Sequence, residues 1–244
     1  MLYDEIGIHY NRQRRADARI AAAVSTALGG ASTVVNVGAG TGAYEPADRR
    51  VVAVEPSAVM IAQRPSSQAC LVRAQAEALP FVDRAFDAAL AVLTMHHWTD
   101  QAAGLAECAR VARDRIVIFT WDPTADGFWL VRDYFPEILA YDRTVFPRLD
   151  SLAAALGEIE VRPVPIPADC ADGFLGAFWR RPTAYLDPGV RSSISSFVRV
   201  KAAGIGLDRL RADLMSGAWE TRNSALLACP EIDLGYRLVV AQAF

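Results

Sequence analysis

The order of apolar and polar residues along this chain predicts alternating strands and helices over its first half. Short apolar runs of the length typical of buried strands occur at 33–37, 51–55, 70–74, 86–93 and 115–121. Apolar positions at helical spacing precede or separate these runs at 11–28, 57–62 and 101–111. Such alternation is typical of an α/β protein whose parallel sheet carries helices on both faces.

The regular alternation stops after residue 121. A helix is predicted over 151–156 and strands over 159–167 and 236–243, and the stretch between these two strands is too long for a hairpin loop. We therefore predict an α/β, Rossmann-like, doubly wound and mostly parallel seven-stranded sheet, with a helical cap inserted after its fifth and sixth strands. The predicted units are a core over 1–121, a cap segment over 122–147, a core helix and strand over 148–167, a cap insertion over 168–235 and a final core strand over 236–244.

Composition and charge narrow the class of protein. Of the 244 residues 52% are hydrophobic and 22% charged, and the net charge is -3, which is typical of a soluble globular protein and not of a nucleic-acid binder. No apolar run approaches the ~18 residues that span a bilayer, and no basic segment followed by an apolar one opens the chain. Four separated cysteines without a Cys-x-x-Cys pair argue against a disulfide framework or a zinc site. We expect a cytoplasmic protein without a membrane span, an export signal or a metal.

A glycine-rich turn follows the first predicted strand and is the strongest chemical signal in the chain. Gly38, Gly40 and Gly42 permit a tight turn that brings the backbone close to a ligand. Glu55 ends the next strand, where a carboxylate can accept hydrogen bonds from two ribose hydroxyls. The turn alone leaves three interpretations open: a turn without a ligand, a dinucleotide site, because Gly38-x-Gly40-x-x-Ala43 fits the loose fingerprint, and a site for S-adenosylmethionine.

Further segments favour the third interpretation. The loop at 75–81, with a small residue, polar side chains and an apolar end, is typical of one that binds an adenine ring. The segments Val-Asn-Val-Gly-Ala-Gly-Thr-Gly, Val-Glu-Pro-Ser, Ala-Glu-Ala-Leu-Pro-Phe, Phe-Asp-Ala-Ala and Met-His-His-Trp follow one another between residues 35 and 98. In order and spacing they resemble the motifs of class I S-adenosylmethionine-dependent methyltransferases, of the methyltransferase type 11 kind. The resemblance covers residues 30–121 and implies S-adenosylmethionine as cofactor, with S-adenosylhomocysteine as product.

The resemblance also implies a role for individual residues. The cofactor's methionine part is assigned to Gly38, Ala39, Gly40 and Gly42, its carboxylate to Tyr10 and Arg12, its ribose to Glu55, its adenine to Pro56, Met60, Gln75, Ala76 and Glu77, and its sulfonium to Leu93 and Thr94. Gln75 departs from the family, in which many members carry Asp at this position. Tyr10 and Arg12 equally fit a solvated helix start, and we interpret Arg14 and Arg15 as surface charge.

Two histidines at the end of the fourth strand are the candidates for a catalytic base. Transfer of a methyl group from a sulfonium is an in-line displacement, which needs an aligned nucleophile and, for some acceptors, removal of a proton. Histidine suits the second task because its ordinary pKa is about 6.5. Between His96 and His97 we favour His97, which neighbours Trp98. A packing role for both rings fits the sequence equally well.

Aromatic residues gather outside the predicted sheet and suggest walls for a flat or apolar acceptor. We assign acceptor binding to Trp98, Trp121, Trp129, Trp179 and Arg180, although a small core under the cap is the favoured explanation for most of the aromatics. Segments between 172 and 188 loosely resemble the cap of small-molecule methyltransferases similar to the trans-aconitate enzymes.

The leading hypothesis is methyl transfer from S-adenosylmethionine to a small organic molecule in secondary metabolism, with O-methylation favoured over N- or C-methylation. A nicotinamide-dependent oxidoreductase and a catalytically silent S-adenosylmethionine-binding partner subunit are the alternatives. We expect a monomer or homodimer whose partner is its acceptor, and no nucleic acid or membrane.

Overall fold

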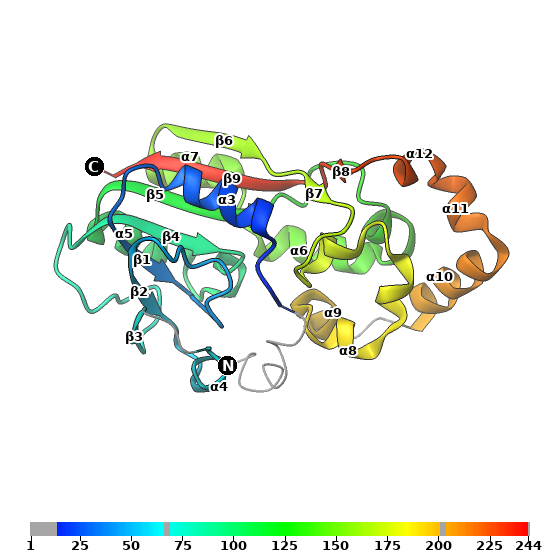
Figure 1. Ribbon diagram of the computed structural model, residues 1–244, viewed down its shortest axis with the longest axis horizontal. Coiled ribbons are helices and arrows are strands. Elements are labelled where there is room, and N and C mark those ends of the chain that lie inside the picture. Colours follow the sequence, from blue (N-terminus) through cyan, green and yellow to red (C-terminus); the bar gives the residue numbers. More distant parts are fainter. Residues whose placement is uncertain (1–13, 66–68, 201–203, 244) are drawn as a thin grey trace.

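A computed structural model describes residues 14–65, 69–200 and 204–243 and contains the predicted seven-stranded sheet (Figure 1). Its strand order is β3-β2-β1-β4-β5-β9-β6. The strands are β1 (Thr33–Val37), β2 (Arg50–Val54), β3 (Cys70–Val72), β4 (Phe86–Val92), β5 (Ala112–Trp121), β6 (Ile159–Pro163) and β9 (Tyr236–Gln242). The first five are parallel, and β9 runs antiparallel to both of its neighbours, β5 and β6. The prediction of a mostly parallel, doubly wound sheet is confirmed.

The strand order creates a topological switch point at the centre of the sheet. From β1 the chain proceeds outward through β2 to β3 and then returns to place β4 on the other side of β1. Connections on the two sides of β1 therefore diverge, and a crevice forms at the carboxyl ends of β1 and β4. Ligands of open α/β sheets bind at such a point.

Helices cover both faces of the sheet, as the alternation of side chains along each strand requires. On one face Val34 packs with Ile20, and on the other Val35 packs in a separate core with Leu105 and Leu152. The helices concerned are α3 (Ala18–Ala27) on the first face and α5 (Gln101–Val111) and α7 (Leu149–Leu156) on the second.

The strand predicted over 159–167 is divided into two. β6 ends at Pro163, and β7 (Ile166–Pro167) pairs instead with β8 (Glu231–Ile232) in a separate two-stranded sheet. Prolines 163 and 165 provide the physical reason, because a proline has no N–H to donate to a neighbouring strand.

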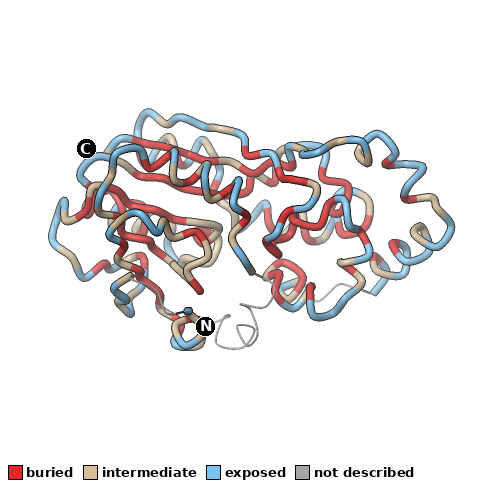
Figure 2. The backbone as a smooth tube through the Cα atoms, viewed as in Figure 1, coloured by how far each residue is buried: buried red, intermediate tan, exposed pale blue. Residues whose placement is uncertain are grey.

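The cap stands beyond the carboxyl ends of the parallel strands, on the right of Figure 1. Its helices are η2 (Leu130–Tyr134), α6 (Pro136–Val145), η3 (Leu175–Phe178), η4 (Pro182–Leu186), α8 (Pro188–Ser192), α9 (Ser195–Val200), α10 (Gly204–Ser216), α11 (Ala218–Arg222) and α12 (Ser224–Leu227). Burial extends from the strands into the inner part of the cap, while much of α10 to α12 is exposed (Figure 2). Among the helices of the described residues, none combines the length and apolar character that crossing a membrane requires.

Candidate functional site

A cavity of about 310 Å³ lies at the switch point, between the carboxyl ends of the strands and the cap helix α9. Thirteen residues that the sequence analysis assigns to cofactor, catalysis or acceptor line it: Gly38, Ala39, Gly40, Glu55, Pro56, Met60, Gln75, Ala76, Glu77, Leu93, Thr94, His97 and Trp98. Tyr10 and Arg12 lie outside the described residues. The tertiary structure thus brings together four separate segments of the motif-bearing half of the chain.

The glycine turn is held against the end of β2. The N–H groups of Gly38 and Ala39 both donate to the carbonyl of Val54, at 2.9 Å each. Gly38 has φ +71°, and a Cβ at this position would collide with the side chain of Thr94, which follows β4. Glycine is therefore required at position 38 both by its backbone conformation and by the close approach of a side chain.

Glu55 joins this turn to the beginning of the next helix. Its Oε2 accepts a hydrogen bond from Gly40 N–H at 2.8 Å, and its Oε1 accepts one from Ser57 N–H at 2.9 Å. Ser57 in turn caps α4 (Ala58–Ala62), since its Oγ accepts from Met60 N–H. The carboxylate thus fixes the geometry of the turn and faces the cavity, and it has about four acceptor sites in all.

Gly42 does not line the cavity and lies beside a buried ion pair that the sequence analysis missed. Arg64 Nη2 contacts Glu45 Oε2 at 2.6 Å, and Arg64 Nη1 donates to the carbonyl of Gly40 at 3.0 Å. A Cβ on Gly42 would stand 2.9 Å from Arg64 Nη2. The absent side chain at 42 leaves room for the arginine that braces the turn, and direct contact between Gly42 and the cofactor stays a prediction.

The loop predicted to bind adenine is held by hydrogen bonds to the backbone just before the next helix. Glu77 Oε1 accepts hydrogen bonds from the N–H groups of Thr99 and Asp100, at 2.7 and 3.1 Å, just before α5 begins. Ala76 is buried beside it. Glu77 therefore anchors the loop to α5 while it lines the cavity.

Leu93 has an unusual backbone conformation at the centre of the site. Its φ is +47°, in the left-handed region that a leucine rarely adopts, and its N–H donates to Phe119 carbonyl at 2.7 Å. Residues held in this region cost free energy and cluster at functional sites. The strain turns the chain sharply after β4, directly before Thr94 and the two histidines.

The histidines lie in η1 (Met95–His97) and face different cavities. His97 lines the large cavity, whereas His96 stacks on Phe146 with ring centroids 4.1 Å apart and lines a second cavity of about 40 Å³. Burial lowers the pKa of His97 to about 3, with the positive charges of Arg199 and Arg14 acting in the same direction. Burial likewise holds the pKa of His96 well below its ordinary value. His97 and the same two arginines lower this pKa further. Both rings are therefore neutral at neutral pH, and each is a weaker base than an ordinary histidine.

Two arginines, Arg14 and Arg199, line the large cavity and were not predicted from the sequence as site residues. Arg14 Nε contacts Asp172 Oδ1 at 2.7 Å, and Tyr44 OH donates to Asp172 Oδ2 at 2.8 Å. The interpretation of Arg14 as surface charge is therefore wrong. Because Asp172 lies 158 residues away, no local pattern could have revealed this pair. Arg199 comes from α9 of the cap, a segment with no motif.

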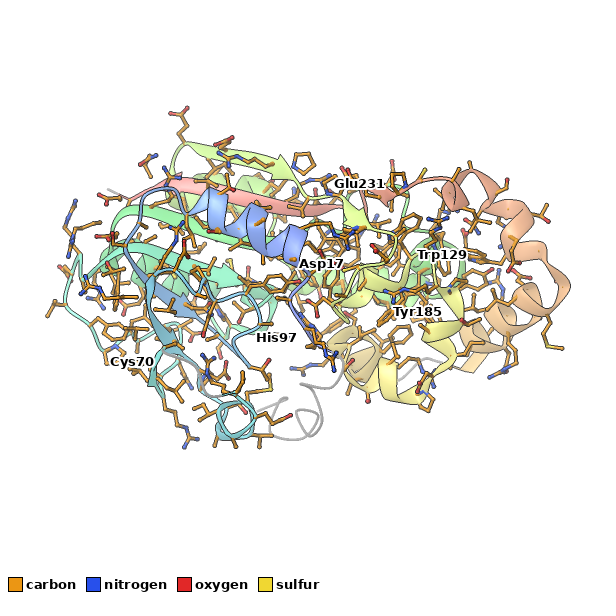
Figure 3. All side chains as sticks on the ribbon, in the orientation of Figure 1. Asp17, Cys70, His97, Trp129, Tyr185 and Glu231 are labelled. Atoms are coloured by element: carbon orange, nitrogen blue, oxygen red, sulfur yellow. The ribbon has the colours of Figure 1, made fainter. Side chains whose placement is uncertain are left out.

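The predicted acceptor residues separate into those near the cavities and those within the cap. Trp98 lines the large cavity and Trp121 the small one. Trp129 and Trp179 line neither of these cavities and are buried in the cap, where Figure 3 labels Trp129. Trp129 Nε1–H donates to the Trp179 carbonyl at 3.0 Å, and Trp179 Nε1–H donates to the Ile166 carbonyl at 2.9 Å. Arg180 is exposed on the cap surface, so its acceptor role stays a prediction.

In the part of the chain that the structure describes, no cluster of histidine, cysteine, aspartate or glutamate is suited to hold a metal ion. The polar groups of the site include backbone N–H donors, the carboxylates of Glu55 and Glu77, two arginines, a neutral histidine, and amide and hydroxyl side chains. Such a set suits an organic cofactor with nucleoside and amino-acid parts.

A family model described as a methyltransferase domain matches residues 35–119. Among solved structures, a candidate methyltransferase from an antibiotic biosynthesis pathway of Anabaena variabilis is 35% identical, with a TM-score of 0.85, covering 93% of this chain and 98% of that chain. Among curated protein sequences none matches significantly.

More distant structures share the fold alone. A possible histamine N-methyltransferase of Thermotoga maritima is 16% identical, with a TM-score of 0.60 and coverage of 100% and 99% of the two chains. The [4+2]-cyclase SpnF is 18% identical, with a TM-score of 0.52 and coverage of 98% and 93%. At such low identity these proteins support the architecture and say nothing of the reaction.

Proposed function

Since this chain belongs to the class I S-adenosylmethionine-dependent methyltransferases, we propose that it methylates a small organic molecule. The observation that carries this proposal is the cradle formed by Gly38, Gly40 and Glu55 on the wall of the large cavity. It combines a turn that a Cβ would block with a carboxylate at the tip of β2. These features fit a cofactor with an amino-acid end and a ribose.

When bound, S-adenosylmethionine supplies an electrophilic methyl group on a sulfonium. The glycine turn and Glu55 would hold its methionine and ribose parts, and the loop of Gln75, Ala76 and Glu77 its adenine. Arg14, already paired with Asp172, carries positive charge toward the same cavity and suits a carboxylate. The residues therefore bind and orient the donor through contacts that need no metal.

His97 is the residue that we assign to proton removal from the acceptor. It lines the cavity beside Thr94 and Trp98. Its pKa of about 3 keeps it neutral throughout the physiological range but also makes it a weaker base than an ordinary histidine. It gains a proton only near pH 3. Protonation of His97 should therefore cause no fall in kcat as the pH is lowered from 8 to 5. We expect His97→Ala to lower kcat by about 10- to 100-fold while cofactor affinity is retained.

The position of the cap helix over the cavity supports a small acceptor. Cap helix α9 contributes Arg199 to the cavity wall, so part of the space beyond the strand ends is bounded by the cap. The pathway of the Anabaena protein supports a role in secondary metabolism. We further propose that the reaction is an O-methylation and that the protein is a monomer or homodimer. We also propose a cytoplasmic location, because the four free cysteines suit a reducing compartment.

Calorimetric titration with S-adenosylmethionine and, separately, NADH tests the cofactor. We expect the first to bind, and binding of NADH alone would refute the proposal. Transfer of a tritiated methyl group into a panel of phenols, acids and amines tests the reaction. Cofactor binding without transfer to any member would favour the silent partner subunit.

A further inference from the structure

The small cavity of about 40 Å³ adjoins the cofactor cavity, because Arg14 and Leu93 line both. It is formed where β5, β9, η1 and the cap helices α6 and α9 meet. A cavity of this size holds a small head group and not a ring, since a single water already needs about 10–15 Å³ in this measure.

Aromatic rings form much of its wall. Trp121 contacts Phe146 with ring centroids 5.4 Å apart, and Tyr236 contacts Phe174 at 4.7 Å. Trp121 and Tyr236 are themselves 6.3 Å apart, so the four rings form one connected wall. Aromatic faces carry partial negative charge and attract cations.

A buried carboxyl group faces the same space. Asp142, on α6, is 1% exposed and lines the cavity. Its two oxygens lie 2.9 and 2.8 Å from Ser196 Oγ, which donates to the carboxylate. Within the described residues no arginine, lysine or histidine forms an ion pair with it. Burial raises the pKa of Asp142 to about 7, and the Ser196 hydrogen bond acts in the opposite direction.

The other titratable groups around the cavity do not balance this charge. Arg14 is paired with Asp172 instead, since its Nε lies 2.7 Å from Asp172 Oδ1. His96 is neutral because burial lowers its pKa, and Tyr236 is neutral because burial raises its pKa. His96 Nδ1 is buried without a hydrogen-bond partner among the described residues. The cavity therefore combines an aromatic wall, an unpaired carboxyl group and a ring nitrogen with unused hydrogen-bonding capacity.

We propose that this cavity receives a protonated amino group of the methyl acceptor, with Asp142 as its counter-ion and the aromatic wall around it. A cation here would take the place of the ion-pair partner that is missing among the described residues. The inference rests on the proposed function, because it names a substrate class for the same site. It fixes the charge of the acceptor and leaves open which of its atoms is methylated.

The test measures binding of phenethylamine and of its uncharged analogue 2-phenylethanol by calorimetry, with and without S-adenosylhomocysteine. We expect the amine to bind more tightly than the alcohol. Asp142→Asn keeps the size of the side chain and removes its charge, and should weaken amine binding by about 10- to 100-fold while alcohol binding is unchanged. Glu137→Gln, on the same helix α6 but outside the cavity lining, is the matched control and should bind the amine normally.

A second variant separates charge recognition from a structural role and also covers the case in which Asp142→Asn fails to fold. Amine binding should strengthen as pH rises through the pKa of Asp142, near 7, because ionisation creates the counter-ion. Ser196→Ala removes the hydrogen bond that lowers this pKa, so the midpoint should move to higher pH. A structural role alone would leave the midpoint in place.

Equal binding of amine and alcohol, or undiminished amine binding by Asp142→Asn, would overturn the inference. If S-adenosylhomocysteine binds and the amine does not, the substrate class is wrong and the methyltransferase proposal stands. If S-adenosylhomocysteine itself fails to bind, the proposed function fails, and the titration without it still decides whether the cavity takes an amine.

Discussion

The cofactor cradle and the cap interior are built in opposite ways. In the cradle, Gly38, Gly40 and Glu55 lie within a short stretch and interact through backbone N–H groups. In the cap, contacts join distant segments, as when Trp129 Nε1 donates to a carbonyl 50 residues away. Local contacts leave a recognisable motif, whereas long-range packing requires only that apolar side chains fit together.

The difference also concerns what each region tolerates. The cradle depends on missing side chains and positive φ values, so a single added methyl group disturbs it. The cap depends on large side chains that fill space, so their removal costs stability. Substitutions in the two regions should therefore affect different measurements, and four of them test this expectation.

Trp129→Ala should have the largest effect. The ring is fully buried and packs against Trp219 and Tyr134, with centroids 5.1 and 5.8 Å away. We expect the free energy of unfolding to fall by about 3–5 kcal/mol, measured by urea denaturation. Val82→Ala, at an exposed position, is the control. Cofactor affinity of the folded variant should be unchanged, and a parallel loss would show that cap and cradle act as one unit.

Gly38→Ala should act on binding. The new methyl group must enter the space of Thr94, and alanine must adopt φ +71°. We expect S-adenosylmethionine affinity to fall by about 100-fold, measured by calorimetry. Gly30→Ala is the matched control, since a Cβ there meets nothing within 4 Å. Normal binding by Gly38→Ala would remove the cradle from the cofactor site.

Glu55→Ala should weaken S-adenosylmethionine binding by about 1–3 kcal/mol, the range for hydrogen bonds to a charged group. The same calorimetric titration measures it. Glu231→Ala, which removes an exposed carboxylate on β8 that does not line the cavity and is labelled apart from His97 in Figure 3, should bind normally. Unchanged affinity in Glu55→Ala would refute its ribose role.

Arg180→Ala should have the smallest effect. The side chain is exposed, and its Nη1 lies 3.4 Å from the Cys229 carbonyl. We expect the free energy of unfolding to change by no more than about 0.5 kcal/mol, with turnover unaffected. A raised KM for the acceptor would instead support the acceptor role predicted from sequence.

Much of the fold and one side of the site could be predicted from local pattern. The strands at 33–37 and 86–93 and the helix at 101–111 match the structure closely, because burial on both faces and caps such as Asp100 leave local signals. Arg14 and Asp142 could not be predicted, since their partners Asp172 and Ser196 lie 158 and 54 residues away.

The sequence by itself determined the sheet, the glycine turn and the family resemblance, since each depends on residues a few positions apart whose backbone preferences are local. Only the tertiary structure decided which polar groups share a cavity. It placed His97 and His96 in different cavities, enclosed Trp129 in the cap, and placed Asp142 beside an aromatic wall with no cationic side chain paired to it among residues 14–65, 69–200 and 204–243. The physical reason is that burial and charge pairing depend on how distant segments pack, and no spacing along the chain records that packing.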